Sequence, residues 1–336
     1  MARSNITIYD VAARAGVSKS TVSRVLQNDD RVSDRAREAV ETAIQELSYV
    51  PAASARGLRS GENTSVGLLI RNIYTPIYAQ LNYHLQNQFL RLGRHIIQES
   101  VVGPYREFNE ERLLQNLVSL RVKGIIVASG TIPSEAVANY AKRLPIMVVG
   151  RPEPNETLHN VAYAQESHGQ MMAEHLYSMG HREIVIETVE MEYSMGSWAR
   201  NDALIRHAEK LGMTTHPVDV THEPDYSDIL NRVIRGSDST AVVALHDKRA
   251  LQLWRLLRAE GIRVPEDLSI MGSDGVLPGG DLLGLVSLRQ PVEKIAEVAA
   301  SNMNDLIDGR APATPPIRES VRGWITKGTT VARIEL

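Results

Sequence analysis

Residues Gly16 to Leu26, GVSKSTVSRVL, gather hydroxyl groups and positive charges at helical spacing. Ser and Thr weaken the interior of an ordinary surface helix, because their hydroxyls compete with the backbone for hydrogen bonds. Short hydroxyls also let a helix approach phosphate groups closely, and Lys19 and Arg24 are long enough to reach phosphates or the O6 and N7 atoms of guanine. The pattern therefore predicts contact with a nucleic acid. The alternative is a solvated helical bundle whose polar face binds nothing.

Three short helices are expected to position these side chains. Thr7 and Asp10 form a predicted capping pair before the first helix, IYDVAARA, and Gly16 supplies the turn that follows it. Ser18 is placed to cap the second helix, and the third helix begins at Ser33. Two helices joined by a turn with Gly and braced by a third form the arrangement that lays one helix in the major groove of DNA.

A short helix and a linker are predicted over residues 51–63. Pro51 suits the first turn of a helix, but a helix that ends near Leu58 is too short to be stable alone in water. Leu58 between two arginines suits a wedge that opens a base step from the minor groove. The alternative is a flexible linker, and the residues RSGENTS are typical of one.

From Thr64 onward, short runs rich in Val and Ile alternate with stretches of helical spacing. The runs are SVGLLI, RHIIQES, KGIIVAS and PIMVVG, followed by REIVIET, TAVVALH and LSIMGSD. This alternation predicts parallel sheets covered by helices on both faces, and two sets of runs predict two doubly wound lobes. Ligands of such lobes bind beyond the carboxyl ends of the strands, so the cleft between the lobes is the predicted pocket.

Polar and aromatic side chains follow these runs. They suit a ring-shaped polar ligand such as a sugar, because bidentate groups fix its hydroxyls and aromatic faces cover its apolar side. For each residue alone, ordinary placement in a loop is the alternative. The candidate ligand contacts are Asn72, Tyr74, Tyr78, Arg151, Trp198, Arg200, Tyr226, Asp247 and Asp274.

Catalysis is not indicated by any motif. The ten histidines lack metal-ligand spacing, and no Ser lies in a Gly-x-Ser-x-Gly turn. The glycine-rich loop Gly272 to Asp281 lacks the Lys-Ser/Thr pair of a phosphate-binding loop. We therefore expect no enzyme activity, no cofactor and no metal site.

Composition restricts the remaining classes. The chain has no cysteine, which excludes disulfides, and neither a membrane span nor a signal peptide is found, so we expect a cytoplasmic protein without a membrane partner. A sugar-binding transport receptor would need a signal peptide. The net charge of −3 divides unevenly: residues 1–61 carry nine Lys/Arg and seven Asp/Glu, which leaves −5 for the remainder. This local excess of positive charge is a weak indication of nucleic-acid binding.

The segments TIYDVAARAGVSKSTVSRVL and RVSDRAREAVETAIQELSYVPAASARGLRSG resemble the headpiece of the LacI/GalR family of bacterial transcriptional repressors. The resemblance covers essentially the whole chain. It implies an N-terminal all-α helix-turn-helix headpiece and an α/β two-lobed effector domain like that of periplasmic binding proteins. The implied ranges are a headpiece at 1–50, a hinge helix and linker at 51–63, an N-terminal lobe at 64–163 with a return segment at about 291–323, and a C-terminal lobe at 164–290 with 324–336.

The resemblance also implies partners and contact residues. The partners are a palindromic double-stranded DNA operator, a second copy of the chain and a small-molecule effector, a sugar or related metabolite. Asn72, Arg151, Arg200, Tyr226, Asp247 and Asp274 match positions that contact the effector in the family, and Leu58 matches a leucine inserted into the operator. The implied DNA contacts are Thr7, Tyr9, Ser18, Lys19, Ser20, Thr21, Ser23, Arg24, Ala55 and Leu58.

Three positions depart from the family pattern. Ala52 follows Pro51 where Asn is common, which alters capping of the hinge helix. Ala164-Gln165 stands where Asp-Asn is common, which removes a carboxylate from the cleft, and Ser273 replaces an aromatic residue. Fewer acceptors for hydroxyls suit a smaller, more apolar or anionic effector. The chain also lacks the heptads of a tetramerisation helix, so a homodimer is expected.

Overall fold

The computed structural model describes residues 6–26, 29–49, 64–101, 110–130, 132–221, 226, 229–231 and 238–335. They belong to two compact units, Met1–Thr64 and Ser65–Leu336. The predicted hinge helix and linker at 51–63, with Ala55 and Leu58, lies outside the described residues.

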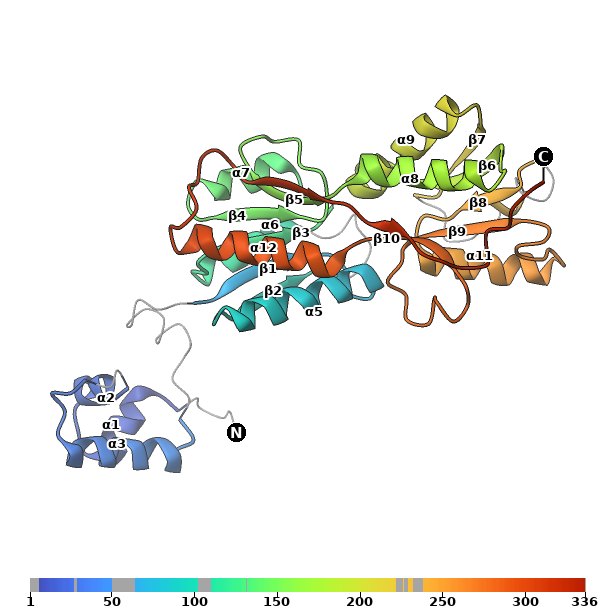
Figure 1. The fold of residues 1–336 in the computed structure, drawn as a ribbon. Coiled ribbons are helices and arrows are strands. Elements are labelled where there is room, and N and C mark those ends of the chain that lie inside the picture. The colour runs from blue at the N-terminus through green and yellow to red at the C-terminus, as the bar shows by residue number, and fades with distance from the viewer. Residues whose placement is uncertain are drawn as a thin grey trace. The chain divides into compact units, whose positions relative to one another are not determined.

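The first unit contains the three predicted helices, α1 (Ile8–Ala15), α2 (Lys19–Val25) and α3 (Asp34–Glu46) (Figure 1). Each helix contributes a fully buried valine, Val11, Val22 or Val40, to one small hydrophobic core. The caps are confirmed, because Thr7 and Asp10 form a capping box and Ser18 Oγ accepts a hydrogen bond from the Thr21 amide. Gly16 turns the chain with φ of 66°, a left-handed conformation that glycine adopts at little cost.

The second unit holds two sheets. The first has the order β11-β5-β4-β3-β1-β2, and all of its strand pairs are parallel. Its strands are β1 (Val66–Ile70), β2 (Ile96–Ser100), β3 (Ile125–Ala128), β4 (Ile146–Val149), β5 (His159–Tyr163) and β11 (Arg318–Val321). Its order places a strand from near the end of the chain at one edge.

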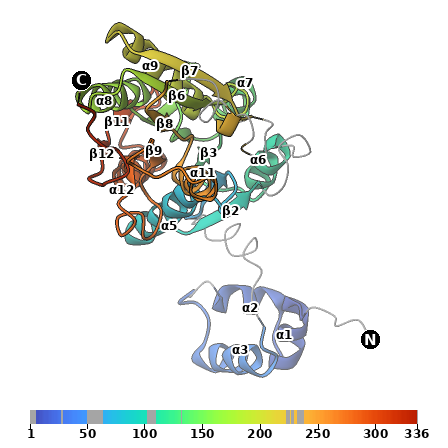
Figure 2. The same ribbon diagram turned by 90° about the vertical axis from the view of Figure 1, so that its right-hand side faces the viewer.

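The second sheet has the order β12-β10-β9-β8-β6-β7. Its pairs are parallel except for β10 with β12, which is antiparallel. Its strands are β6 (Glu183–Thr188), β7 (Thr214–Asp219), β8 (Ala241–Val243), β9 (Ser269–Asp274), β10 (Val286–Arg289) and β12 (Trp324–Ile325). Figure 1 shows the two sheets side by side in this unit, and Figure 2 shows the same elements turned by 90°.

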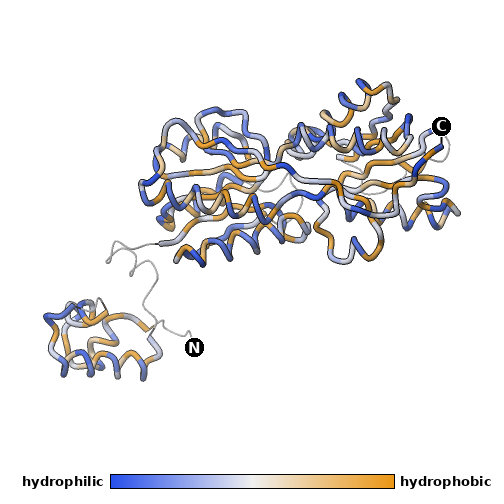
Figure 3. The backbone as a smooth tube through the Cα atoms, in the orientation of Figure 1, coloured by the Kyte–Doolittle hydropathy of each residue, from blue (hydrophilic) through white to orange (hydrophobic). Residues whose placement is uncertain are grey.

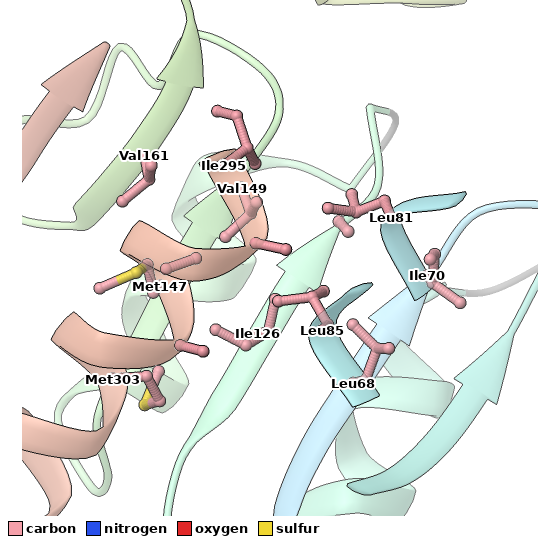
Figure 4. Close-up of a cluster of buried hydrophobic side chains, with 14 of the residues drawn as sticks. Leu68, Ile70, Leu81, Leu85, Ile126, Met147, Val149, Val161, Ile295 and Met303 are labelled. Carbon is pink, nitrogen blue, oxygen red and sulfur yellow. The ribbon is translucent and has the colours of Figure 1, made fainter. Parts of the chain in front are cut away.

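Helices cover both faces of each sheet, as predicted. On the first sheet, α5 (Pro76–Arg91) and α12 (Val292–Ile307) cover one face, while α6 (Glu110–Ser119) and α7 (Ser134–Ala141) cover the other. On the second sheet, α8 (Gln165–Ser178) and α9 (Met195–Lys210) lie opposite α11 (Asp247–Ala259). Figure 4 shows Leu81 and Leu85 of α5 and Met303 of α12 packed on the strands of the first sheet. Strands β1, β3 and β4 are apolar and buried along their whole length, which is typical of parallel strands covered on both faces. Figure 3 shows how hydrophobic and hydrophilic segments alternate along the chain.

The chain crosses between the two lobes at three places: after β5, after β10 and between β11 and β12. These segments pack closely, since His168 Nε2 accepts a hydrogen bond from the amide of Gly323 at 2.8 Å. A Cβ at Gly323 would lie 2.1 Å from the carbonyl oxygen of Arg289, so only glycine fits there. The crossings bring the carboxyl ends of both sets of strands to one cleft.

All seven predicted strand runs are confirmed as β1 to β4, β6, β8 and β9. The other five strands, β5, β7, β10, β11 and β12, are not among these runs. Their sequences, such as TTHPVD in β7 and RESV in β11, contain no long apolar run that would mark them. No helix among the described residues is both long enough and apolar enough to span a bilayer.

Candidate ligand cavity and nucleic-acid interface

Helix α2 presents a polar surface built from its first turn. Ser18 Oγ lies 2.7 Å from Ser20 Oγ and 2.9 Å from Thr21 Oγ1, so the three hydroxyls form one connected group at the start of the helix. The first turn of a helix also presents backbone amides and the positive end of the helix dipole. Hydroxyls and amides gathered in this way suit contacts with phosphate oxygens.

The cation on this surface is held by an aromatic residue of α1. Lys19 Nζ donates a hydrogen bond to the hydroxyl of Tyr9 at 3.0 Å and lies 4.7 Å from the centre of its ring. This hydrogen bond lowers the pKa of the exposed Tyr9 hydroxyl, and the charge of Lys19 acts in the same direction. Arg24, in the last turn of α2, is exposed, and Ser23 beside it is half-buried.

Thr7 differs from the other predicted DNA contacts, because its hydroxyl donates to Asp10 Oδ2 at 2.6 Å in the capping box. Its observed role in this structure is to fix the start of α1. The structure brings Tyr9, Ser18, Lys19, Ser20 and Thr21 together around the start of α2.

A cavity of about 130 Å³ lies between the two lobes of the second unit. Its walls come from the carboxyl ends of β1, β3, β4, β8 and β9, from α5 and α9, and from the crossing segments. The cavity therefore lies where the sequence predicts a pocket, beyond the carboxyl ends of the strands and between the lobes. Of the predicted ligand contacts, Tyr78, Arg151, Arg200 and Asp274 line it.

Two buried arginines line this cavity, one from each lobe. Arg200, on α9, is 2% exposed, and its Nη2 donates to the carbonyl oxygen of Leu245 at 2.9 Å. Arg151, after β4, is 4% exposed and forms an ion pair at 3.0 Å with Glu153, whose side chain is fully buried. Burial lowers the pKa of both arginines, while neighbouring carboxylates oppose that shift. Both side chains stay protonated at neutral pH, since arginine keeps its charge in proteins.

Several buried polar atoms on the cavity wall have no hydrogen-bond partner among the described residues. Buried polar groups in native proteins are nearly always paired, so a group of unpaired ones in one cavity indicates a place for a ligand or for water. The atoms are Arg151 Nε, Arg200 Nε, Tyr163 Oη, Gln165 Oε1 and Gln290 Oε1.

Asp274 ends β9 with φ of 90°. This conformation is costly for a residue with a side chain, and such strain is concentrated at functional sites. The carboxylate is buried and its Oδ1 accepts a hydrogen bond from Gln290 Nε2 at 2.7 Å. Asp274 thus adopts a strained backbone conformation at a position where its side chain lines the cavity.

The lobes touch each other around the cavity. The Arg71 guanidinium lies 5.1 Å from the centre of the Tyr193 ring, and Arg151 Nη1 lies 3.5 Å from the Met195 sulfur. A Cβ at Gly196 would lie 3.3 Å from Gln165 Nε2, so the start of α9 is packed against the crossing segment. Each of these contacts depends on the angle between the lobes.

Asp247 does not line this cavity, in contrast to the sequence prediction. It is the first residue of α11, and its side chain turns towards β10, where its Oδ1 accepts a hydrogen bond from Ser287 Oγ at 2.5 Å. A separate small cavity borders it, together with Gly275, Asp281 and Lys327. The preceding residue, His246, lines the cavity between the lobes.

Four further predicted contacts also lie elsewhere. Trp198 is on the outer side of α9, a quarter-turn or more from Ser197 and Arg200, and is 41% exposed. Tyr226 packs in an apolar cluster and donates its hydroxyl to Gln252. Asn72 accepts a hydrogen bond from the Tyr74 amide in a turn, and Tyr74 is 77% exposed under Lys248 Nζ.

Some lining residues were not predicted. Arg71, Ser197 and His246 follow predicted runs and differ from the chosen residues only by one position in the sequence. Tyr163, Gln165 and Gln290 lie on the crossing segments, and no spacing in the sequence marks them.

Tyr163 provides a test of the cavity as a binding site. Burial raises the pKa of its hydroxyl, and the negative charge of Asp274 raises it further. The hydroxyl has no hydrogen-bond partner among the described residues. A buried unpaired hydroxyl costs about 1–3 kcal/mol. Tyr163→Phe is therefore expected to raise the Tm of the ligand-free chain by about 2–4 °C for each kcal/mol regained. Calorimetry on the ligand-free protein measures this, and a fall in Tm would show that the hydroxyl supports the fold.

Asp247 provides a pH test. Burial and then the charge of Asp274 raise its pKa to about 7, whereas hydrogen bonds from Ser287 and two backbone amides oppose the shift. In the unfolded chain this carboxyl loses its proton near its ordinary value of about 4, so the folded state binds more protons between pH 4 and 7. The contribution of this carboxyl to the free energy of unfolding is therefore greatest below pH 4, and it decreases as the pH rises from 4 through 7.

We expect the free energy of unfolding of the wild type, relative to Asp247→Asn, to fall with rising pH by up to about 1.4 kcal/mol per pH unit in this range. Urea unfolding at a series of pH values measures the difference, in which contributions from buried histidines cancel. Parallel curves for the two proteins would contradict the raised pKa.

No three His, Asp or Glu side chains of the described residues form a group that could hold a metal ion. The two units together define the class of the protein: a helix-turn-helix unit and a two-lobed α/β ligand-binding unit in one chain. Comparison with known proteins agrees with both parts. Residues 7–52 match the bacterial regulatory proteins of the lacI family, and residues 173–330 match the periplasmic binding protein-like domain.

Curated relatives extend this similarity along the chain. Catabolite control protein A of Staphylococcus xylosus is 31% identical over 277 residues, which cover 79% of this chain and 81% of that protein. The transcriptional regulator GalR of Escherichia coli is 29% identical over 320 residues, with 90% of each chain covered. The chain belongs to the lacI family of bacterial regulatory proteins.

Solved structures share the fold. A lac repressor dimer bound to operator and the anti-inducer ONPF has a TM-score of 0.79 and 21% identity, covering 98% of this chain and 100% of that one. The transcriptional regulator CelR in complex with cellobiose has a TM-score of 0.69 and 26% identity, covering 97% and 99%.

Proposed function

We propose that this chain is a transcriptional regulator, most simply a repressor, that binds a palindromic DNA operator as a homodimer. A small-molecule effector, a sugar or related metabolite, binds in the cavity between the lobes and controls the affinity for the operator. The observation that supports this proposal is the cavity itself, whose walls come from both lobes and hold several buried polar atoms with no hydrogen-bond partner in the part of the chain that the structure describes.

Helix α2 is proposed to read the operator. Its first turn carries connected hydroxyls beside Lys19, and Arg24 is exposed one and a half turns further along. In helix-turn-helix proteins the start of the second helix contacts base edges, while hydroxyls and amides fix the register on the phosphates. We assign base contacts to Lys19, Ser20 and Arg24 and phosphate contacts to Tyr9, Ser18, Thr21 and Ser23.

The ranges of the parts follow from the same proposal. The headpiece spans 1–50, a hinge spans 51–63, the N-terminal lobe spans 64–163 with about 291–323, and the C-terminal lobe spans 164–290 with 324–336. Ala55 and Leu58 of the hinge are proposed to contact the minor groove, with both copies of Leu58 opening the central step of the operator. We propose no catalytic role for any residue and a cytoplasmic location.

The effector is proposed to act through the angle between the lobes. A ligand shifts an equilibrium only by its difference in affinity for the two states. The contacts of Arg71 with Tyr193 and of Arg151 with Met195 join the two lobes, so a ligand that touches both lobes in the cavity favours one angle between them. By reciprocity, that preference changes the affinity for DNA.

Selection of genomic DNA fragments by the purified full chain tests this function. At physiological salt we expect recovery of one short inverted repeat, with half-sites spaced to match a two-fold dimer. The matched control is a chain with Lys19→Ala and Arg24→Ala, which should recover no repeat. Equal recovery of fragments by both proteins would show that α2 does not read the DNA.

A further inference from the structure

We propose that the effector is a small polyhydroxylated acid, a sugar acid or sugar phosphate, rather than a neutral sugar. The proposal rests on the proposed function, because it names the ligand of the same cavity. Its negative group is assigned to the space between Arg151, Arg200 and the start of α9. Its hydroxyls are assigned to Gln165, Gln290 and Asp274.

The charged side chains on the cavity wall are three arginines and one aspartate, which are Arg71, Arg151, Arg200 and Asp274. The partner of Arg151, Glu153, has a fully buried side chain and does not line the cavity. Asp274 and Asp247 lie near Arg200, but only Asp274 lines the cavity, and one of its oxygens already accepts a hydrogen bond from Gln290. The wall that a ligand meets is therefore more positive than negative.

The unpaired donors favour an oxyanion over a neutral hydroxyl. Arg200 and Arg151 are each more than nine-tenths buried, and the Nε of each has no partner among the described residues. A hydrogen bond from such a charged donor is stronger to an anionic oxygen than to a neutral hydroxyl. Both side chains line the same cavity and are buried, so each guanidinium group attracts an anion there more strongly than it would in bulk water.

The start of α9 also contributes positive character to the cavity wall. Ser194, Gly196 and Ser197 line it, and α9 runs for 16 residues from Met195, so its first turn presents backbone amides there. Ser194 Oγ accepts the Ser197 amide at 3.4 Å, which fixes the orientation of this turn. Gly196 has no side chain to cover this turn, and a Cβ there would lie 3.3 Å from Gln165 Nε2.

The cavity wall also holds hydrogen-bond acceptors. The Oε1 atoms of Gln165 and Gln290 have no partner among the described residues, and Asp274 supplies a carboxylate held in a left-handed conformation. Acceptors of this kind pair with ligand hydroxyls. The volume of about 130 Å³ is below the ~300–1,000 Å³ typical of sites for drug-sized ligands, which restricts the ligand to about one ring or a short chain.

The test measures the Tm of the purified full chain with inorganic phosphate, D-gluconate, D-glucuronate and D-glucose 6-phosphate, each at constant ionic strength set with NaCl. D-Glucose is the neutral counterpart. We expect at least one acid to raise the Tm by about 2–5 °C when it saturates the site, and D-glucose to raise it less. The variants Arg151→Gln and Arg200→Gln should abolish the rise.

Arg206→Gln is the matched control on the same helix, because Arg206 is part-exposed, pairs with Glu166 and Asp202, and lies outside the cavity wall. It should keep the rise. The proposal is overturned if no acid raises the Tm above the NaCl control, if D-glucose stabilises as much as the acids, or if the rise persists in both cavity variants. The wild-type comparison of acid with neutral sugar decides the question even if a variant does not fold. Operator recovery by the wild type, measured separately, shows whether the proposed function stands when this proposal fails.

Discussion

Arg24→Ala is expected to weaken binding of the chain to its selected inverted repeat by about a hundredfold at physiological salt. A good contact from an arginine to a base edge contributes about 1–3 kcal/mol, and a dimer on a two-fold operator loses the contact in both half-sites. Arg24 lies exposed on α2, so its loss leaves no hole in the core of the first unit. Fluorescence anisotropy with labelled repeat DNA measures the effect.

Arg14→Ala is the matched control for Arg24. It removes one positive charge from the same unit, but Arg14 is on α1 and forms an exposed ion pair with Glu46 of α3. Such a pair contributes about 0–1 kcal/mol to stability, so the fold is retained. We expect less than about a threefold change in affinity. Equal weakening by the two substitutions would show that only net charge matters and would contradict readout by α2.

Arg200→Met is expected to lower retention of the effector by at least about a hundredfold. It removes a buried charge-assisted hydrogen-bond donor, and loss of such a partner costs about 2–5 kcal/mol because the ligand's polar groups then stay buried and unpaired. Methionine fills much of the space of the alkyl chain, so the cavity keeps its shape. Mass spectrometry of compounds retained from a small-molecule extract of the source cells measures the loss.

Folding of the Arg200 variant needs its own control. Arg200 lies among Asp274 and Asp247, and removal of one member of a buried charge group destabilises a fold. Arg200→Lys keeps the charge but not the planar fork, so it should fold and still bind the effector weakly. Arg206→Met on the outer face of α9 should retain the same compound as the wild type. Retention of that compound by Arg200→Met at wild-type levels would exclude Arg200 from the site.

The sequence predicts the elements of this protein well because local signals mark them. Thr7, Ser18 and Gly16 are residues whose side chains or conformations define helix ends, and each stands where the structure uses it. The Val and Ile runs mark the strands that are buried on both faces. The short edge strands β11 and β12 lack such a signal, since their pairing depends on neighbours distant in the chain.

The site is predicted only in part, for two physical reasons. A helix turns by about 100° per residue, so adjacent residues at its start face different surroundings. His246 therefore lines the cavity while Asp247 turns away, and Ser197 lines it while Trp198 does not. Tyr163 and Gln290 line the same cavity because the two crossing segments that carry them lie side by side in the fold. These segments are far apart in the sequence, so no local sequence pattern predicts that they come together.

The most direct test of the account is the affinity of the wild-type chain for its inverted repeat, measured with and without the compound that it retains from the source cells. We expect this compound to change the dissociation constant by about 5- to 150-fold, which corresponds to the coupling free energies typical of allosteric proteins. The direction of the change distinguishes release from co-repression. An unchanged dissociation constant at a concentration that saturates the cavity would contradict the coupling of the two units.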